Sequence, residues 1–187
     1  KEPAVTLTEA DGTAIPAAEY TVAYRKNVGV GAATVTVTAK ADGNYSFNDV
    51  TETFQIQKRK ARIVTAPEAA GDPLTFNTRA QRLVTPGAGE GGTVVYSVDG
   101  GAYSEVIPTG TKAKDYTVLY KVAGDDNHSD SDVGTVIVTI APKPVTATIE
   151  LLDENGDPLV NYVYDGSAKE PQVVVKDGST EIAAKEY

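Results

Sequence analysis

The residues of this chain that could bind a ligand lie mainly in one acidic run, residues 124–132, GDDNHSDSD. Its four aspartates are the candidate calcium ligands: Asp125, Asp126, Asp130 and Asp132. Carboxylate oxygens are the hard ligands that calcium prefers. However, the run lacks the bidentate glutamate that would close a calcium loop, and Asp, Asn and Gly are also the ordinary residues of turns. A plain turn is therefore the favoured interpretation.

A shorter acidic run, DENGDP at residues 153–158, alternates Asp153, Asn155 and Asp157 as calcium loops do. It lacks a closing ligand as well, so the same interpretation is favoured. Apart from calcium, which these two runs leave open, no cofactor is predicted.

No catalytic residue is predicted. Nucleophilic catalysis needs an activated nucleophile beside a base, which is usually a histidine. The chain has one histidine, His128, and nothing near it in the sequence completes a catalytic constellation. There is no cysteine, and the GAGEGG segment lacks the lysine and the strand-to-helix context of a phosphate-binding loop. The chain is therefore expected not to be an enzyme.

The charge of the chain argues against one class of partner. It has 17 Lys and Arg against 26 Asp and Glu, a formal net charge of −9. Nucleic-acid binding depends on clustered basic residues, so no such partner is expected. The one basic cluster is expected to be a solvated linker between two modules: Lys58, Arg59, Lys60 and Arg62. The apolar runs are too short to cross a bilayer, so no membrane insertion by this segment is expected.

The composition predicts an all-β fold. Val occurs 24 times and Thr 22 times, against 7 Leu. Side chains branched at Cβ favour extended backbone and lose rotamer freedom in helices. A β-sandwich built from them can bury an adequate core at this chain length.

An internal repeat organises the strands. Residues 31–50 align without a gap on residues 114–133, and seven of the twenty positions are identical. Each copy reads as an alternating strand, an acidic turn and a second strand, which predicts a tandem β-module of about 84 residues. Tyr45 stands where the second copy has His128, so this position accepts either aromatic ring and is expected to belong to the turn.

A third, partial copy follows. Lys169-Glu170-Pro171 repeats Lys1-Glu2-Pro3 at an offset of 168, twice 84, and with one deletion Ile182 and Tyr187 match Ile15 and Tyr20. A weaker similarity joins residues 76–80, FNTRA, to residues 164–168, YDGSA. The predicted order is A, B, A. Its domains are residues 1–59 (carboxyl-terminal part of module A), 60–142 (complete module B) and 143–187 (amino-terminal part of a second module A).

Alternation of apolar and polar residues places the individual strands. One is expected around Val5 and Leu7. The others are expected at residues 20–25, 33–40, 53–57, 62–65, 74–76, 82–84, 93–98, 115–122, 134–140, 145–152 and 162–164. Asp99-Gly100-Gly101 follows an alternating strand, which predicts a tight hairpin there.

Several of these segments resemble the bacterial Ig-like surface repeats. The similarity lies in EYTVAYRKN (19–27), GAATVTVTAKADGNY (31–45), TFQIQK (53–58) and the Tyr164-Asp165-Gly166 element. Module B looks like a companion class that alternates with these repeats. The resemblance implies tandem Ig-like β-sandwich modules that serve as stalk, spacer or adhesion modules of secreted or cell-wall-attached proteins. It implies no catalytic residue.

The expected partners follow from this arrangement. They are neighbouring modules of the same polypeptide and a host or cell-surface protein or glycan, and the expected localisation is extracellular, secreted or at the cell surface. A carbohydrate- or calcium-binding module is the alternative function, with Tyr45 and Tyr103 as the tyrosines to test for sugar binding. Because both end modules are incomplete, two chains could complete a module between them, head to tail.

Overall fold

The computed structural model describes residues 1–71 and 73–184 of the chain. They form β-strands and one short 3-10 turn, η1 (Ala17–Glu19), so the predicted all-β class is confirmed. Two compact units divide the chain, Lys1–Ala141 and Pro142–Tyr187. Within the described ranges, no helix is long and apolar enough to cross a membrane.

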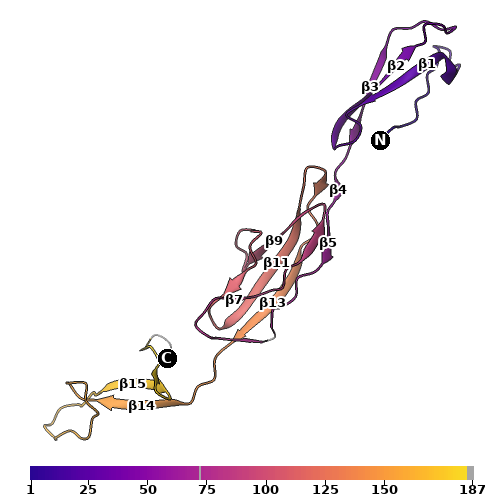
Figure 1. Cartoon of the computed structure of the whole chain (residues 1–187). Coiled ribbons are helices and arrows are strands. Elements are labelled where there is room, and N and C mark those ends of the chain that lie inside the picture. Colours follow the sequence, from indigo (N-terminus) through magenta and orange to yellow (C-terminus); the bar gives the residue numbers. More distant parts are fainter. Residues whose placement is uncertain (72, 185–187) are drawn as a thin grey trace. The chain divides into compact units, whose positions relative to one another are not determined.

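The amino-terminal region of the first unit, residues 1–58, contains one antiparallel sheet in the order β1-β2-β3 (Figure 1). Its strands are β1 (Tyr20–Arg25), β2 (Gly31–Ala39) and β3 (Val50–Ile56). The inward positions of these alternating sequences supply a small core, because every second side chain of a strand points to the same face. The buried members of that core are Ile15, Tyr20 and Val37, and partly buried side chains pack against them: Val5, Leu7, Tyr45 and Phe47.

The strand predicted around Val5 and Leu7 is not a regular strand. This segment forms a narrow hairpin instead, with a single bridge between Thr8 and Ala14 and a 2.8 Å hydrogen bond from the Ile15 N–H to the Leu7 carbonyl. Alternation is enough to turn both apolar side chains toward the core. A regular strand also needs a continuous ladder of backbone hydrogen bonds, which one bridge does not provide.

The central region, residues 59–141, is built around a four-stranded sheet in the order β6-β13-β11-β9. These strands are β6 (Leu74–Thr75), β13 (Gly134–Ala141), β11 (Lys114–Gly124) and β9 (Gly92–Val98). The predicted hairpin after β9 is confirmed, since Tyr96 and Ser104 exchange both backbone hydrogen bonds. The core cluster of this region comprises Leu83, Val84, Tyr96, Tyr116, Val118, Val138 and Ile140.

Three two-stranded sheets complete the central region: β5 (Arg62–Thr65) with β8 (Ala88–Glu90), β7 (Gln81–Arg82) with β10 (Thr109–Gly110), and β4 (Arg59–Lys60) with β12 (His128–Ser129). Two pairs in the region are parallel, β4 with β12 and β6 with β13. Strand β4, through which the chain enters the region, and the carboxyl end of β13, from which the chain leaves it, lie at opposite ends of the region (Figure 1).

The two long hairpins of the first unit share their strand order but differ by one residue in register. Thr36 pairs with Thr51 in the amino-terminal region, and Leu119 pairs with Thr135 in the central region. The offset is therefore 83 in the first strand and 84 in the second. The gapless alignment of residues 31–50 with 114–133 is wrong at its end, because one extra residue follows the central turn.

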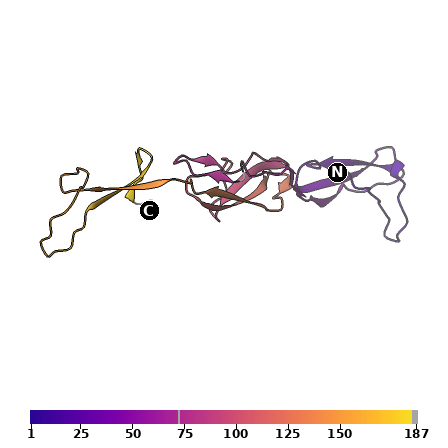
Figure 2. The same ribbon diagram turned by 90° about the horizontal axis from the view of Figure 1, so that it is seen from below.

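The carboxyl-terminal unit contains β14 (Ala147–Leu152), β15 (Gln172–Asp177) and β16 (Thr180–Glu181) in one antiparallel sheet. Residues 153–171 connect the first two strands as a long loop (Figure 2). The strand predicted at residues 162–164 is wrong. Tyr164 is 92% exposed, and no strand among the described residues pairs with this segment, so its alternating pattern has no sheet to join.

Two hydrogen-bonding patterns recur between the repeats. The Ile182 N–H donates to the Val175 carbonyl at 2.8 Å, the counterpart of the bond from Ile15 to Leu7. In addition, the side-chain oxygens of Asn77 and Asp165 each accept a hydrogen bond from the backbone N–H two residues later, at 3.0 and 2.9 Å. These two turns are the segments that FNTRA and YDGSA align.

The Asp165 turn is also held by side chains. Lys169 and then Ser167 donate hydrogen bonds to the carboxylate, and together they lower the pKa of Asp165 to about 2. In both turns the residue after the capping side chain has a left-handed backbone, with φ 65° at Thr78 and φ 82° at Gly166. The Asp-Gly pair of the Tyr-Asp-Gly element is thus a turn-forming pair, with its glycine at the position that needs a positive φ.

The observed division of the chain differs from the predicted domain boundaries. The units separate between Ala141 and Pro142, one residue before the predicted boundary. The predicted boundary after residue 59 lies within the first unit and cuts β4 in two. Arg59 and Lys60 were expected in a linker, but their backbone pairs with β12 and so belongs to the central region.

Removal of core volume should test the central cluster. Leu83 is fully buried, so we expect Leu83→Ala to lower the free energy of unfolding by about 2–5 kcal/mol through loss of apolar burial and creation of a cavity. Urea denaturation followed by circular dichroism measures this change. Val64 on β5 is 57% exposed, and Val64→Ala is the control, with an expected change below about 0.5 kcal/mol. Equal effects of both substitutions would contradict this placement of the core.

The left-handed turn offers a stabilising substitution. A left-handed backbone costs a residue with a Cβ about 1–2 kcal/mol, and glycine avoids that cost. We expect Thr78→Gly to raise the free energy of unfolding of the central region by about 1 kcal/mol, even though the Thr78 hydroxyl loses its bond to the Asn77 carbonyl. The matched reverse change, Gly166→Thr, should destabilise the carboxyl-terminal unit. Thermal melting of both variants measures the effect, and destabilisation by Thr78→Gly would be the contrary result.

Candidate functional site

The acidic run of the sequence lies beside the basic cluster. Strand β12 contains His128 and runs parallel to β4, so the segment expected to be a linker is held against the acidic turn. The N–H of Arg59 donates to the Asn127 carbonyl at 3.1 Å, and the N–H of Ala61 donates to the Ser129 carbonyl at 2.8 Å. We call residues 58–61 together with residues 124–132 the entry clasp.

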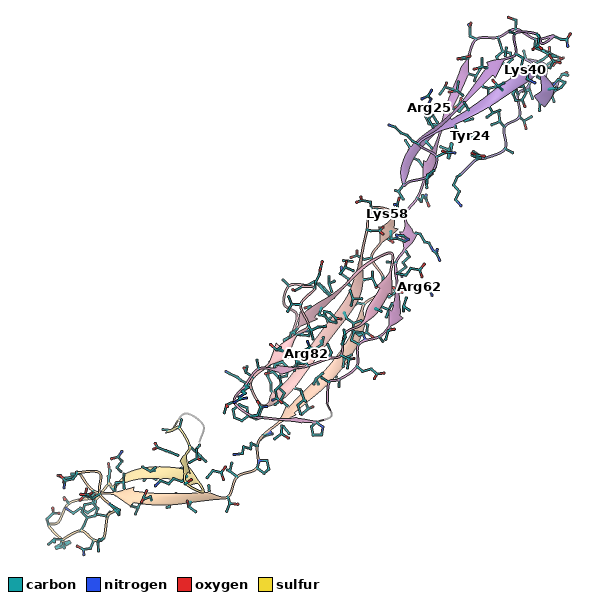
Figure 3. The ribbon with its side chains drawn as sticks, in the orientation of Figure 1. Tyr24, Arg25, Lys40, Lys58, Arg62 and Arg82 are labelled. Carbon is teal, nitrogen blue, oxygen red and sulfur yellow. The ribbon has the colours of Figure 1, made fainter. Side chains whose placement is uncertain are left out.

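Basic side chains reinforce this backbone pairing. Lys58 Nζ donates to the carbonyls of Asp125 and His128, at 3.1 and 3.3 Å. Lys60 Nζ pairs with Asp132 Oδ1 at 2.5 Å. Figure 3 shows Lys58 and Arg62 where the chain enters the central region. Two members of the basic cluster, Lys58 and Lys60, are thus matched by acceptors of the central region.

Arg62 lies next to the entry clasp and has a partner on β8. Its Nε and Nη2 both contact Glu90 Oε2, at 2.7 and 2.5 Å. The hydrogen bond from Arg62 is the main cause of the lowered pKa of Glu90. A hollow of about 10 Å³, which is room for about one water molecule, is lined by Arg59, Lys60, Arg62, Glu90 and His128.

Asp130 has a partner on the neighbouring strand. Its carboxylate accepts hydrogen bonds from Lys121 Nζ and from the Gly124 N–H, and the Lys121 bond is the main cause of the lowered pKa of Asp130. The side chain of Lys121 is only 23% exposed, and its Nζ lies 4.9 Å from the centre of the Tyr103 ring. Ring and carboxylate together therefore hold this ammonium group in place.

Asp125 and His128 form the turn itself. Asp125 Oδ1 accepts a 2.8 Å hydrogen bond from the Asn127 N–H and lies 2.7 Å from His128 Nδ1. The bond to His128 is the largest cause of the lowered pKa of Asp125. The imidazole lies against Gly91, where an added Cβ would come within 2.6 Å of the ring. Its counterpart Tyr45 also packs against neighbouring strands, so the aromatic ring is part of the packing in both copies.

The four predicted calcium ligands are thus engaged to different degrees. All four are exposed; Asp125, Asp130 and Asp132 have the partners described above, whereas no side-chain partner of Asp126 is found within the described part of the chain. Within residues 1–71 and 73–184, no group of three or more His, Asp or Glu side chains could hold a metal ion. The calcium site therefore stays a prediction, and an ion bound here would have to compete with two lysines.

The second acidic run is also a turn. Asp153 Oδ1 accepts hydrogen bonds from the N–H groups of Asn155 and Asp157, at 2.8 and 3.0 Å, and these bonds lower the pKa of Asp153. This carboxylate stabilises the reversal of the chain after β14. An open depression of about 350 Å³ adjoins it and is lined by residues 153–155 and 158–162.

Comparisons of the chain with protein-family models, with curated proteins and with solved structures found no match. The entry clasp is the feature of the candidate site that sequence reasoning missed. A basic KRKAR segment and an acidic DDNHSDSD segment were both visible in the sequence, and their opposite charge could have suggested that they pair. The two-residue parallel strands that join them leave no periodic signal, because alternation needs at least four residues to be recognised.

Calcium binding can be tested by thermal melting. A ligand that binds only the folded state raises the melting temperature. We expect millimolar calcium to leave the melting temperature unchanged, because the carboxylates are held by Lys121, Lys60 and backbone N–H groups. Magnesium at the same concentration controls for ionic strength. A rise specific to calcium that disappears in Asp126→Asn would establish the predicted site instead.

Proposed function

We propose that the chain is a non-catalytic array of Ig-like modules that acts as a load-bearing stalk or spacer of a bacterial surface protein, outside the cell. The resemblance of its sequence to bacterial Ig-like surface repeats supports this proposal. The recurring arrangement of strands supports it too, since β1-β2-β3 and β9-β11-β13 have the same order and the same antiparallel pairing.

The observation that carries the proposal is the way in which the chain enters and leaves the central region. The entering strand β4 pairs in parallel with β12, and the leaving strand β13 pairs in parallel with β6. At the exit, the Phe76 N–H donates to the Ala141 carbonyl at 2.8 Å. Because both connections lie at opposite ends of the region, tension along the chain pulls each terminal strand along its own axis (Figure 1).

This direction of pulling loads the strand pairs in shear. The backbone hydrogen bonds of a sheet lie across the strands, so sliding one strand past another strains several of them at once. Pulling a strand sideways breaks them one after another. A region joined to its neighbours through sheared parallel pairs therefore resists extension better than one that is peeled from a hairpin end.

The entry clasp adds to this resistance. Lys58 and Lys60 tie β4 to the acidic turn on both sides of the paired backbone. Exposed ion pairs contribute little when isolated, at most about 1 kcal/mol each. Here one ion pair, Lys60 with Asp132, and the Lys58 hydrogen bonds act together with backbone hydrogen bonds on a strand of only two residues. These contacts lie at β4, where a force applied through the chain would first act on the central region.

Single-molecule force spectroscopy tests the proposal. The chain contains no cysteine, so introduced cysteines give unique attachment points. Handles at Gln57→Cys and Pro144→Cys pull the central region through its natural connections. Handles at Ala102→Cys and Lys112→Cys pull the adjoining ends of β9 and β11 apart sideways. We expect a several-fold higher unfolding force in the first geometry. Equal forces, or a lower force along the natural direction, would contradict a load-bearing function.

A further inference from the structure

The amino-terminal region and the carboxyl-terminal unit contain two versions of the same hairpin. Residues 4–15 and residues 172–182 follow the same Lys-Glu-Pro sequence and share a bond from an isoleucine N–H to a carbonyl in the first arm of the hairpin, from Ile15 to Leu7 and from Ile182 to Val175. They differ in their partners. The first hairpin covers the core of the β1-β2-β3 sheet, and the second pairs with β14.

We infer that the carboxyl-terminal unit of one chain docks on the β1-β2-β3 sheet of a second chain and replaces residues 1–15 there. Val173, Val175 and Ile182 would take the places of Val5, Leu7 and Ile15. Strand β14 would dock together with them. It would supply a strand that residues 4–15, which we call the resident hairpin, do not have. Residues 1–15 would then cover the sheet in the isolated chain, and the carboxyl-terminal unit of a second copy would cover it in the assembly.

The pairing of β14 with β15 supports the inference. Ile149 lies opposite Val175 and Leu151 opposite Val173, so these four side chains share one face. The counterparts of the two valines, Leu7 and Val5, are the ones that pack against the core of the first unit. Ile149 is 69% exposed, Leu151 38% and Val173 47%. Docking would therefore bury two large apolar side chains for which the resident hairpin has no counterpart.

The replacing hairpin, residues 172–182 with the preceding Lys-Glu-Pro sequence, can accept the same tyrosine hydrogen bonds as the resident hairpin. The hydroxyl of Tyr24 donates to the Pro3 carbonyl, and the hydroxyl of Tyr20 lies 3.4 Å from the Val5 carbonyl. Tyr24 is labelled on β1 in Figure 3. Both acceptors are backbone carbonyls, which Pro171 and Val173 also have. The second Lys-Glu-Pro sequence can thus present the same acceptors to the same tyrosines.

The length of the chain favours a second copy over folding back on the same chain. Five residues, Pro142 to Thr146, join β13 to β14, and they span at most about 18 Å. The central region separates this connection from the β1-β2-β3 sheet, and β11 alone, with 11 residues, is about 36 Å long. An assembly of this kind is heterologous, because the two contacting surfaces differ. It joins copies head to tail and extends into an open-ended oligomer.

Sedimentation velocity on the full chain over a wide range of concentration tests the inference. We expect the mass to grow with concentration beyond a dimer. Ile149→Asp should weaken association by at least about ten-fold, because it places a charge on the docking face of β14. Circular dichroism verifies that this exposed position leaves the fold intact. Val160→Asp, at an 89% exposed position in the 153–171 loop, is the control and should change nothing.

A second variant distinguishes replacement from other modes of association. Ile15→Asp loosens the resident hairpin and frees the sheet, so we expect it to strengthen association. The inference is overturned if the unaltered chain is a monomer at every concentration, if Ile149→Asp associates as the unaltered chain does, or if Ile15→Asp weakens association. The unfolding force of the central region does not enter this test, so the load-bearing proposal stands or fails separately.

Discussion

The structure depends on the burial of one face of three antiparallel strands, which are β9, β11 and β13 in the central region and β1, β2 and β3 in the amino-terminal region. In the central region this face belongs to β11 and its neighbours, where Val118, Val138 and Ile140 are almost fully withdrawn from solvent. The chain contains no cysteine, so no disulfide can assist the core. Cohesion must therefore come from apolar burial and from the completeness of the strand pairing. The amino-terminal sheet has a smaller core of the same kind, completed by the hairpin of residues 4–15.

The strands that carry this burial could be predicted from the sequence, because alternation of Val and Thr over six or more residues has one structural interpretation. The hairpin at Asp99 was equally visible, since its turn residues favour positive φ. The contacts that join distant short segments were not predictable. Strand β4 has two residues and pairs with β12 across nearly seventy positions. Tyr162 to Tyr164 shows the opposite failure, because alternation without a partner does not make a strand.

The candidate site is an example of charge used for architecture. An acidic run resembles a cation site when it is considered alone, yet most of its carboxylates here have lysine, histidine or backbone N–H partners. One of these partners, Lys60, belongs to a segment whose composition resembles a linker, and Lys58 of the same segment donates to backbone carbonyls of the acidic run. Sequence alone could identify the residue types but not the partners, because opposite charges attract whichever segments the topology brings together. The placement of β4 decides what the acidic residues do.

The long connection between β14 and β15 has a consequence for how such a chain can diversify. The register of these two strands is set by their own ladder, from Ala147 opposite Asp177 to Leu152 opposite Gln172. The intervening residues 153–171 lie at the surface, and the chain reversal at their start is closed locally, by the Asp153 side chain and by the backbone bond from the Leu159 N–H to the Leu151 carbonyl. Their length and composition can therefore change while the sheet stays as it is. Such a segment can accept insertions and acquire new surface chemistry without cost to the module that presents it.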